Sequence, residues 1–185
     1  MAGTMPRRDI ANVDELKALA HPMRQRVLYH LAFAGSSTAT SVAEALGENT
    51  GSTSYHLRQL ERFGFIEHDP DRPSRRERWW RLVPLDLRSV KDEAAETMEA
   101  GKLGRIRLQR DRDLVDRYMR NRHRLPAAEA AMFSSSATHL TAEELPRFTE
   151  EYVALLIKWW RSEADRPADA VPIAVLFYAF PWPGE

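Results

Sequence analysis

The fold is decided by residues 38–63, which read TATSVAEALGENTGSTSYHLRQLERF. Their first half is a helical pattern that ends at Gly47, a residue suited to the left-handed backbone found at many helix ends. Their second half begins at Asn49, whose side chain is a strong helix N-cap. Two short helices that are joined by such a tight turn predict a helix-turn-helix. The residues expected to face inward are Val42, Ala43 and Leu46 in the first helix and Thr53, Leu57, Leu60 and Phe63 in the second.

The second helix of this motif carries short, polar or planar side chains away from its inward stripe. Such side chains suit a helix that lies in the major groove of DNA and reaches base edges and phosphates. Arg58 could then bond guanine and Gln59 adenine, with contacts to phosphate as the open alternative. The residues of this helix expected to contact DNA are Thr50, Ser52, Ser54, Tyr55, Arg58 and Gln59.

Two helices are predicted before the motif and a β-hairpin after it. Residues 13–20 and 23–34 have helical apolar spacing, and Pro22 suits the first position of the second helix. Residues 65–68 and 75–83 have strand character, and the segment between them is rich in turn-forming residues. Alternation in the second strand predicts Trp80 and Leu82 inward, Trp79 and Arg81 outward.

The hairpin is rich in arginine, as expected of a wing that contacts DNA. Arginines at a loop tip can enter the minor groove or pair with phosphates. The alternative is a solvated hairpin in which the arginines pair with nearby aspartates. The wing residues expected to contact DNA are Arg72, Arg75, Arg76 and Arg78.

Three of these stretches together resemble ArsR-type winged-helix transcriptional regulators. They are LKALAHPMRQRVL (16–28), STSYHLRQLERFGFI (52–66) and RWWRL (78–82), and the resemblance spans about residues 13–83. It implies a homodimer that binds an inverted repeat in DNA, usually as a repressor. Many such regulators sense metals through cysteines, but this sequence contains no cysteine, and Thr53 stands where the motif usually has an apolar residue.

The composition excludes several other classes of protein. Without cysteine there is no disulfide, thiolate metal site or iron–sulfur cluster. The six histidines show no pair at ligand spacing, so no metal and no cofactor are predicted. No nucleophile motif or glycine-rich phosphate loop is present, so an enzyme is not expected. The apolar runs are too short to span a membrane and the first residues do not form a signal peptide, which predicts a cytoplasmic protein.

The rest of the sequence predicts a long helix and a small α/β unit. Residues 84–125 form a charged amphipathic helix, which pairing with a second copy would cover. Residues 131–140 and 171–180 are predicted strands, and a capping box at Thr141 and Glu144 opens a helix that extends to about residue 164. The residues expected to be buried on this last helix are Leu145, Phe148, Tyr152, Leu155, Leu156 and Trp159.

The sequence therefore predicts an α+β protein with three parts. A winged helix-turn-helix DNA-binding domain occupies residues 1–83, a linking or dimerisation helix residues 84–125, and an α/β dimerisation or effector domain residues 126–185. The net charge is zero, but residues 126–185 carry nine acidic and four basic side chains, which leaves the front of the chain basic. The predicted function is a homodimeric regulator, a repressor by its resemblance, that binds double-stranded DNA at an inverted-repeat operator.

Two alternatives to this function remain open. The C-terminal aromatic residues could line a pocket for a small-molecule effector, although core and dimer interface are the commoner use of such residues. The winged helix could instead serve protein–protein assembly. The aromatic residues concerned are Trp159, Trp160, Phe177, Tyr178, Phe180 and Trp182.

Overall fold

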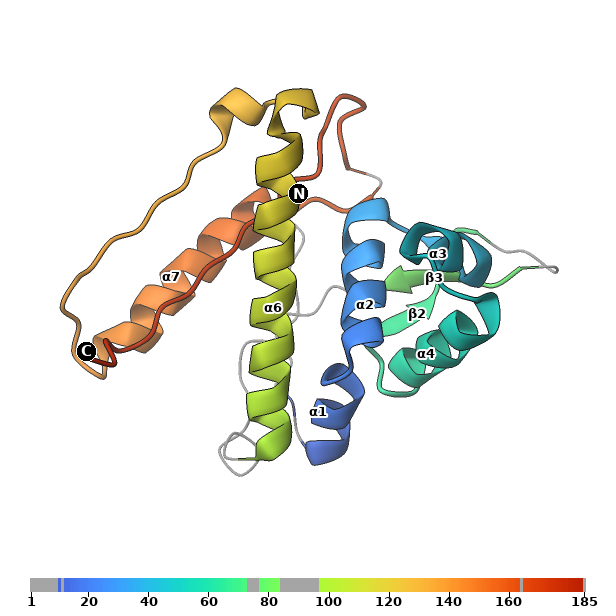
Figure 1. Cartoon of the computed structure of the whole chain (residues 1–185), viewed down its shortest axis with the longest axis horizontal. Coiled ribbons are helices and arrows are strands. Elements are labelled where there is room, and N and C mark those ends of the chain that lie inside the picture. Colours follow the sequence, from blue (N-terminus) through green and yellow to red (C-terminus); the bar gives the residue numbers. More distant parts are fainter. Residues whose placement is uncertain (1–9, 11, 73–76, 84–96, 164, 185) are drawn as a thin grey trace. The chain divides into compact units, whose positions relative to one another are not determined.

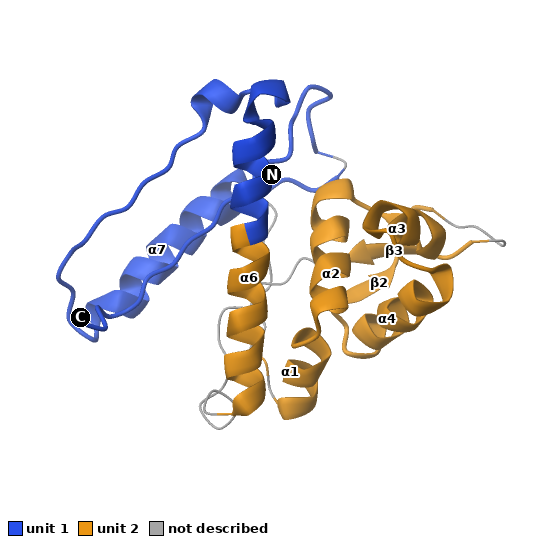
Figure 2. Ribbon diagram, viewed as in Figure 1, with its two compact units in different colours: residues 1–4, 113–185 blue, residues 5–112 orange. Residues whose placement is uncertain are grey.

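A computed structural model of the chain describes residues 10, 12–72, 77–83, 97–163 and 165–184. The chain divides into two compact units, and it passes from one to the other between residues 112 and 113 (Figure 2). No helix in the described parts of the chain has the length and apolar character needed to cross a membrane.

The first unit in chain order is residues 5–112 (orange in Figure 2), and the second unit contains residues 113–185 (blue). The first unit begins with α1 (Val13–Leu19) and α2 (Pro22–Ala34). Both helices have a side-chain N-cap. Asn12 accepts a hydrogen bond from the amide of Glu15 at 2.9 Å, and His21 Nδ1 accepts one from the amide of Met23 at 3.1 Å. Pro22 occupies the first helical position, where a missing N–H costs nothing. Both helices agree with the predicted ranges to within one residue.

The helix-turn-helix consists of α3 (Ala39–Leu46) and α4 (Thr50–Arg62). A capping box between Thr38 and Ser41 starts α3, and Gly47 ends it in the left-handed conformation with φ 67°. Asn49 starts α4 by accepting a hydrogen bond from the amide of Ser52 at 2.7 Å. The predicted helix ends and caps are therefore confirmed at both sides of the turn.

Three short antiparallel strands complete the winged helix: β1 (Ser37–Thr38), β2 (Ile66–His68) and β3 (Trp79–Leu82). Their order is β1-β3-β2, and β2 and β3 lie beside α2 in Figure 1. The hairpin β2–β3 confirms the predicted wing, although β3 is shorter than the predicted strand 75–83. The strand β1 was not predicted from the sequence, because a two-residue strand shows no periodicity and forms only by pairing with β3.

The core of the first unit lies between these helices and the sheet. Trp80 is 3% exposed and Leu82 packs half-buried against the core, which confirms the predicted alternation of the strand. Leu103 from α6 (Met98–Asn121) also belongs to this core. The fully buried residues include Leu16, Leu19, Val27, Val42, Thr53, Leu57, Leu60, Phe65 and Ile66.

The helix α6 confirms part of the long helix predicted for residues 84–125. It runs without a break through Gly101 and Gly104. The earlier turns of the predicted helix, with Leu87, Val90 and Ala94, lie outside the described residues.

The second unit contains the end of α6, two single 3₁₀ turns (Arg122–Arg124 and Ala128–Ala130) and α7 (Glu144–Trp159). The predicted capping box is present: the amide of Glu144 donates to Thr141 Oγ1 at 3.2 Å, and the amide of Thr141 donates to Glu144 Oε2 at 2.8 Å. The predicted helix was longer, since α7 ends at Trp159 rather than near residue 164.

Two predictions for this unit are wrong. Residues 131–140 and 171–180 form no strand, and none of the residues of α7 is buried in the chain. Phe177 packs on Tyr152 with ring centroids 3.8 Å apart, yet Leu155 is 52% and Trp159 66% exposed. The physical reason is that a strand needs a neighbour, and a pair of separate strands rarely makes a stable sheet in one chain.

Candidate nucleic-acid interface

The helix α4 is held rigidly by its inward face. Thr53, Leu57 and Leu60 have no exposed surface, so these three positions fix which side of the helix faces solvent. The Thr53 hydroxyl donates to the carbonyl oxygen of Asn49 at 3.1 Å, which satisfies a polar group in an apolar surrounding. A threonine therefore fills this inward position without an unpaired donor.

The outward face of α4 presents three of the predicted DNA-contacting side chains directly to solvent. Thr50 is exposed at the first helical position, Tyr55 is 57% exposed in the middle, and Arg58 is exposed one turn further on. The guanidinium of Arg58 makes no hydrogen bond or ion pair with the described residues. The other three predicted side chains, Ser52, Ser54 and Gln59, are half-buried.

Arg62 is a further cation on this face, and it was not predicted from the sequence. Arg62 is exposed and lies four positions after Arg58, so both side chains project from the same side of α4. Its guanidinium lies 5.6 Å from the centre of the Phe63 ring. The four-residue spacing from Arg58 was the available signal for this residue.

Acidic side chains near α4 have partners on other elements. Glu48, in the turn before α4, accepts a hydrogen bond from Arg26 of α2 at 2.8 Å, and Glu61 lies 3.3 Å from His68 of β2. Arg26 also donates to the carbonyl oxygen of Leu46, which ties α2 to the end of α3. The ion pair of Glu48 with Arg26 reduces the repulsion that a free carboxylate would exert on a phosphate backbone.

Neighbouring side chains constrain arginines of the wing more than they constrain Arg58. The guanidinium of Arg72 lies 4.6 Å from the centre of the Trp79 ring and 3.9 Å from a carboxylate oxygen of Asp69, so aromatic stacking and a weak ion pair both hold it. Arg78 is exposed. Arg75 and Arg76, which were predicted to contact DNA, lie outside the described residues.

Arg81 is outward on β3, as predicted, but it is bound within the wing. Its guanidinium approaches Glu67 at 2.7 Å, Asp71 at 3.6 Å and Asp69 at 3.8 Å. The hydrogen bond to Glu67 and the neighbouring carboxylates raise the pKa of Arg81. The side chain therefore joins the two strands of the wing.

Two histidines meet where α2 begins and α4 passes it. The ring centroids of His21 and His56 are 4.6 Å apart, and His56 is 8% exposed. Burial lowers the pKa of both imidazoles, and the nearby Arg24 guanidinium lowers each pKa further. Both rings therefore favour the neutral form next to α4.

Comparisons with known proteins bear on the same region. Residues 19–69 match the model of a family described as a helix-turn-helix domain. No curated protein matches the chain. The matched segment runs from the end of α1 to the end of the first wing strand.

Several solved structures resemble most of the chain weakly. They include the adhesin competence repressor AdcR from Streptococcus pyogenes, with 15% identity over 72% of this chain and 80% of that chain and a TM-score of 0.34. The YusO protein from Bacillus subtilis has 18% identity over 77% of this chain and 79% of its own, with a TM-score of 0.32. The heme sensor protein PefR from Streptococcus agalactiae, solved in complex with heme, has 16% identity over 85% and 83% of the two chains and a TM-score of 0.31. At these TM-scores the likeness adds nothing to the argument.

The matched domain and the local geometry agree. The capped helices, the tight turn and the antiparallel wing define a winged helix-turn-helix domain in an α+β protein. The face of this domain that has the features of a nucleic-acid interface is the outward side of α4 together with the wing.

Proposed function

We propose that this protein is a sequence-specific DNA-binding transcriptional regulator, with α4 as the recognition helix and the wing as a second contact. The observation that carries the proposal is the outward face of α4. There Tyr55 and Arg58 are exposed on a helix whose opposite face is anchored in the core, and Arg58 is unpaired among the described residues. A rigid helix with a free planar cation and polar side chains suits base edges in the major groove.

The first experiment selects bound sequences from a random pool of double-stranded DNA, using the full chain. Enrichment of a defined sequence is expected, and its affinity should fall steeply as salt rises, because binding releases counterions from the phosphates. A winged helix that serves only protein assembly would enrich no sequence, and that outcome would overturn the proposal.

The second experiment tests the role of Arg58. Arg58→Ala should weaken binding to the selected sequence by about 1–3 kcal/mol and relax the choice of base at one position. The matched control is Arg161→Ala, which removes an exposed arginine from the second unit and should leave affinity unchanged. Equal affinity of Arg58→Ala and the unaltered protein would remove Arg58 from the interface.

The proposal includes a homodimer. In the second unit Phe133, Trp159, Phe180 and Trp182 are each at least 60% exposed, and apolar surface of this kind commonly marks a protein interface. A second copy would cover this surface and present two recognition helices to the two halves of an inverted repeat. Sedimentation of the full chain should give a dimer, whereas a monomer at all concentrations would contradict it.

The direction of regulation follows from the ArsR-type resemblance of the sequence. We infer a repressor, which competes with transcription by occupying its operator. A reporter gene placed behind the selected sequence should be less active when the protein is present, and more active when Arg58→Ala replaces it. Higher activity with the unaltered protein would instead identify an activator.

A further inference from the structure

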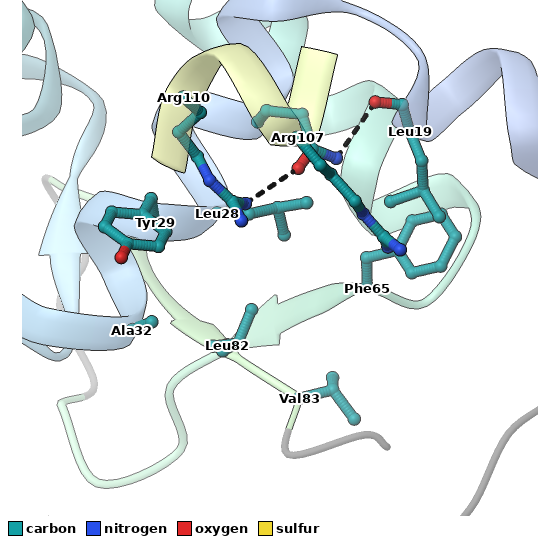
Figure 3. Close-up of a pocket in the computed structure, with 10 residues that line it drawn as sticks. Leu19, Leu28, Tyr29, Ala32, Phe65, Leu82, Val83, Arg107 and Arg110 are labelled. Carbon is teal, nitrogen blue, oxygen red and sulfur yellow. Dashed lines mark hydrogen bonds between the residues drawn. The ribbon is translucent and has the colours of Figure 1, made fainter. Parts of the chain in front are cut away.

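A cavity of about 330 Å³ lies within the first unit, against α2, the wing and the first half of α6 (Figure 3). Its walls are largely apolar and include Leu19, Leu28, Phe65 and Leu82. This volume is at the small end of the range of ligand pockets, and apolar walls with a few polar groups are typical of such sites.

Two arginines of α6 also line the cavity, and they differ in their partners. Arg110 is fully engaged: it donates to Gln25 Oε1 at 3.1 Å and to Asp111 Oδ1 at 2.7 Å, and its guanidinium lies 4.6 Å from the centre of the Tyr29 ring. Gln25 in turn donates to the carbonyl oxygen of Leu19 at 3.0 Å. This network fixes one wall of the cavity.

Arg107 has no comparable partner among the described residues. It is half-buried, and in Figure 3 its side chain extends from α6 toward Phe65. Burial lowers the pKa of Arg107, and the positive charge of Arg110 lowers it further, with Asp111 acting in the opposite direction. A half-buried guanidinium without a carboxylate to bond has lost part of its hydration, and a bound anion would restore an interaction with it.

The charge and the walls together limit what can fill this space. A cation is disfavoured by the two guanidinium groups, and a neutral apolar molecule leaves Arg107 without a partner. An inorganic anion would bond Arg107 but leave the apolar walls unfilled. A small molecule with one carboxylate and an aromatic or short aliphatic body satisfies both, because a carboxylate can accept two parallel hydrogen bonds from a guanidinium.

We propose that this cavity is a binding site for a small amphipathic monocarboxylate, with Arg107 bonding the carboxylate and the walls of α2 and the wing enclosing the apolar body. The site is separate from the outward face of α4. It does touch Phe65, which follows the recognition helix, and Leu82 of β3, so a bound ligand would contact the elements that carry the candidate DNA interface.

The test is calorimetric titration of the full chain, without DNA, with phenylacetate, hexanoate and their neutral amides. Both carboxylates should bind at least about tenfold more tightly than phenylacetamide and hexanamide, as expected for a hydrogen bond to a charged group. Inorganic phosphate should bind more weakly than either carboxylate. Because no DNA is present, the outcome is independent of the proposed regulatory function.

Variants then locate the site. Arg107→Met keeps the length of the side chain and removes its charge, so it should weaken carboxylate binding at least about tenfold. Arg105→Met, at an exposed position of the same helix, should change it by less than about twofold. Arg107→Lys should retain part of the affinity, which separates loss of charge from loss of folding.

The proposal is overturned by either of two results. One is the absence of binding by both carboxylates at millimolar concentration, which is also the outcome if the chain itself fills the cavity. The other is an equal loss of affinity in Arg107→Met and Arg105→Met.

Discussion

The two units of this chain use apolar side chains in opposite ways. Within residues 5–112, apolar side chains at helical and strand spacing such as Leu57, Leu60 and Trp80 are buried. In residues 113–185 the same kind of pattern leaves Leu155 and Trp159 about half or more exposed. A helical apolar stripe therefore indicates that a face will be covered, but not whether the cover comes from the same chain.

The difference also bears on function. The first unit anchors α4 so firmly that its outward side chains have a defined orientation, which specific recognition of DNA requires. The second unit retains a large apolar surface, which association requires. This difference fits the proposed function, in which the first unit binds DNA and the second unit forms the dimer.

The largest effect on stability is expected from truncating a core side chain of the first unit. Leu57→Ala should lower the free energy of unfolding by about 2–5 kcal/mol, because it removes a fully buried side chain and leaves a cavity. Leu155→Ala should change it by less than about 1 kcal/mol at dilutions where the chain is monomeric. Urea unfolding of both full-length variants measures the contrast, and equal losses would mean that α7 is covered within the monomer.

A smaller loss is expected at the start of the recognition helix. Asn49→Ala removes the side chain that accepts the amide of Ser52, and should lower the free energy of unfolding by about 1 kcal/mol. Asn49→Ser retains an acceptor and should restore most of the loss. Unfolding of the three proteins in urea checks the order, and an unaltered Asn49→Ala variant would show that the cap contributes nothing.

A still smaller effect is expected from Thr53→Val. The hydroxyl of Thr53 bonds the carbonyl oxygen of Asn49, which also accepts the amide of Thr53 at 3.1 Å, so no group loses its last partner. The free energy of unfolding should change by less than about 1 kcal/mol. A loss as large as that of Leu57→Ala would show that the hydroxyl has a role beyond its own helix.

The last prediction concerns pH, and its effect at neutral pH is close to zero. Burial and the nearby Arg24 lower the pKa of His21 and His56 in the folded protein, Lys102 adds to this effect at His21, and Glu48 opposes it at His56. The unfolded chain then binds more protons, so stability is complete above about pH 6.5 and falls as the pH drops below it.

The matched variant for this prediction is His21→Asn, which keeps a capping side chain but cannot be protonated. Thermal unfolding between pH 8 and pH 5 should lose less stability in this variant than in the unaltered protein. His123→Asn, at an exposed position, should leave the pH dependence unchanged. An identical pH dependence in all three proteins would show that the pair of histidines does not matter.

Much of the first unit could be predicted from local pattern alone. Gly47 and Asn49 mark their helix ends because left-handed backbone and side-chain capping are properties of single residues. The inward position of Trp80 follows from alternation along one strand. For the candidate DNA contacts, periodicity separated the exposed Tyr55 and Arg58 from the buried Thr53 and Leu57 without any tertiary information.

Other features of the site depend on contacts that are distant in the sequence. Arg81 has the same outward position as a DNA-contacting arginine would have, but its ion pairs with Glu67 and Asp71 occupy it. The strand β1 exists only because β3 lies beside it. The pocket with Arg107 joins α2, the wing and α6, so no single stretch of sequence indicates it.

The sequence by itself thus determined the helices, their caps and the face of the recognition helix, because these follow from interactions within a few residues. The tertiary structure decided which arginines are free, which strands form and where a cavity remains. Those outcomes depend on which groups the fold brings into contact from separate elements. In the second unit residues 131–140 and 171–180 have no strand partner among the described residues, and a second copy of the chain is the partner that we propose for their exposed apolar side chains.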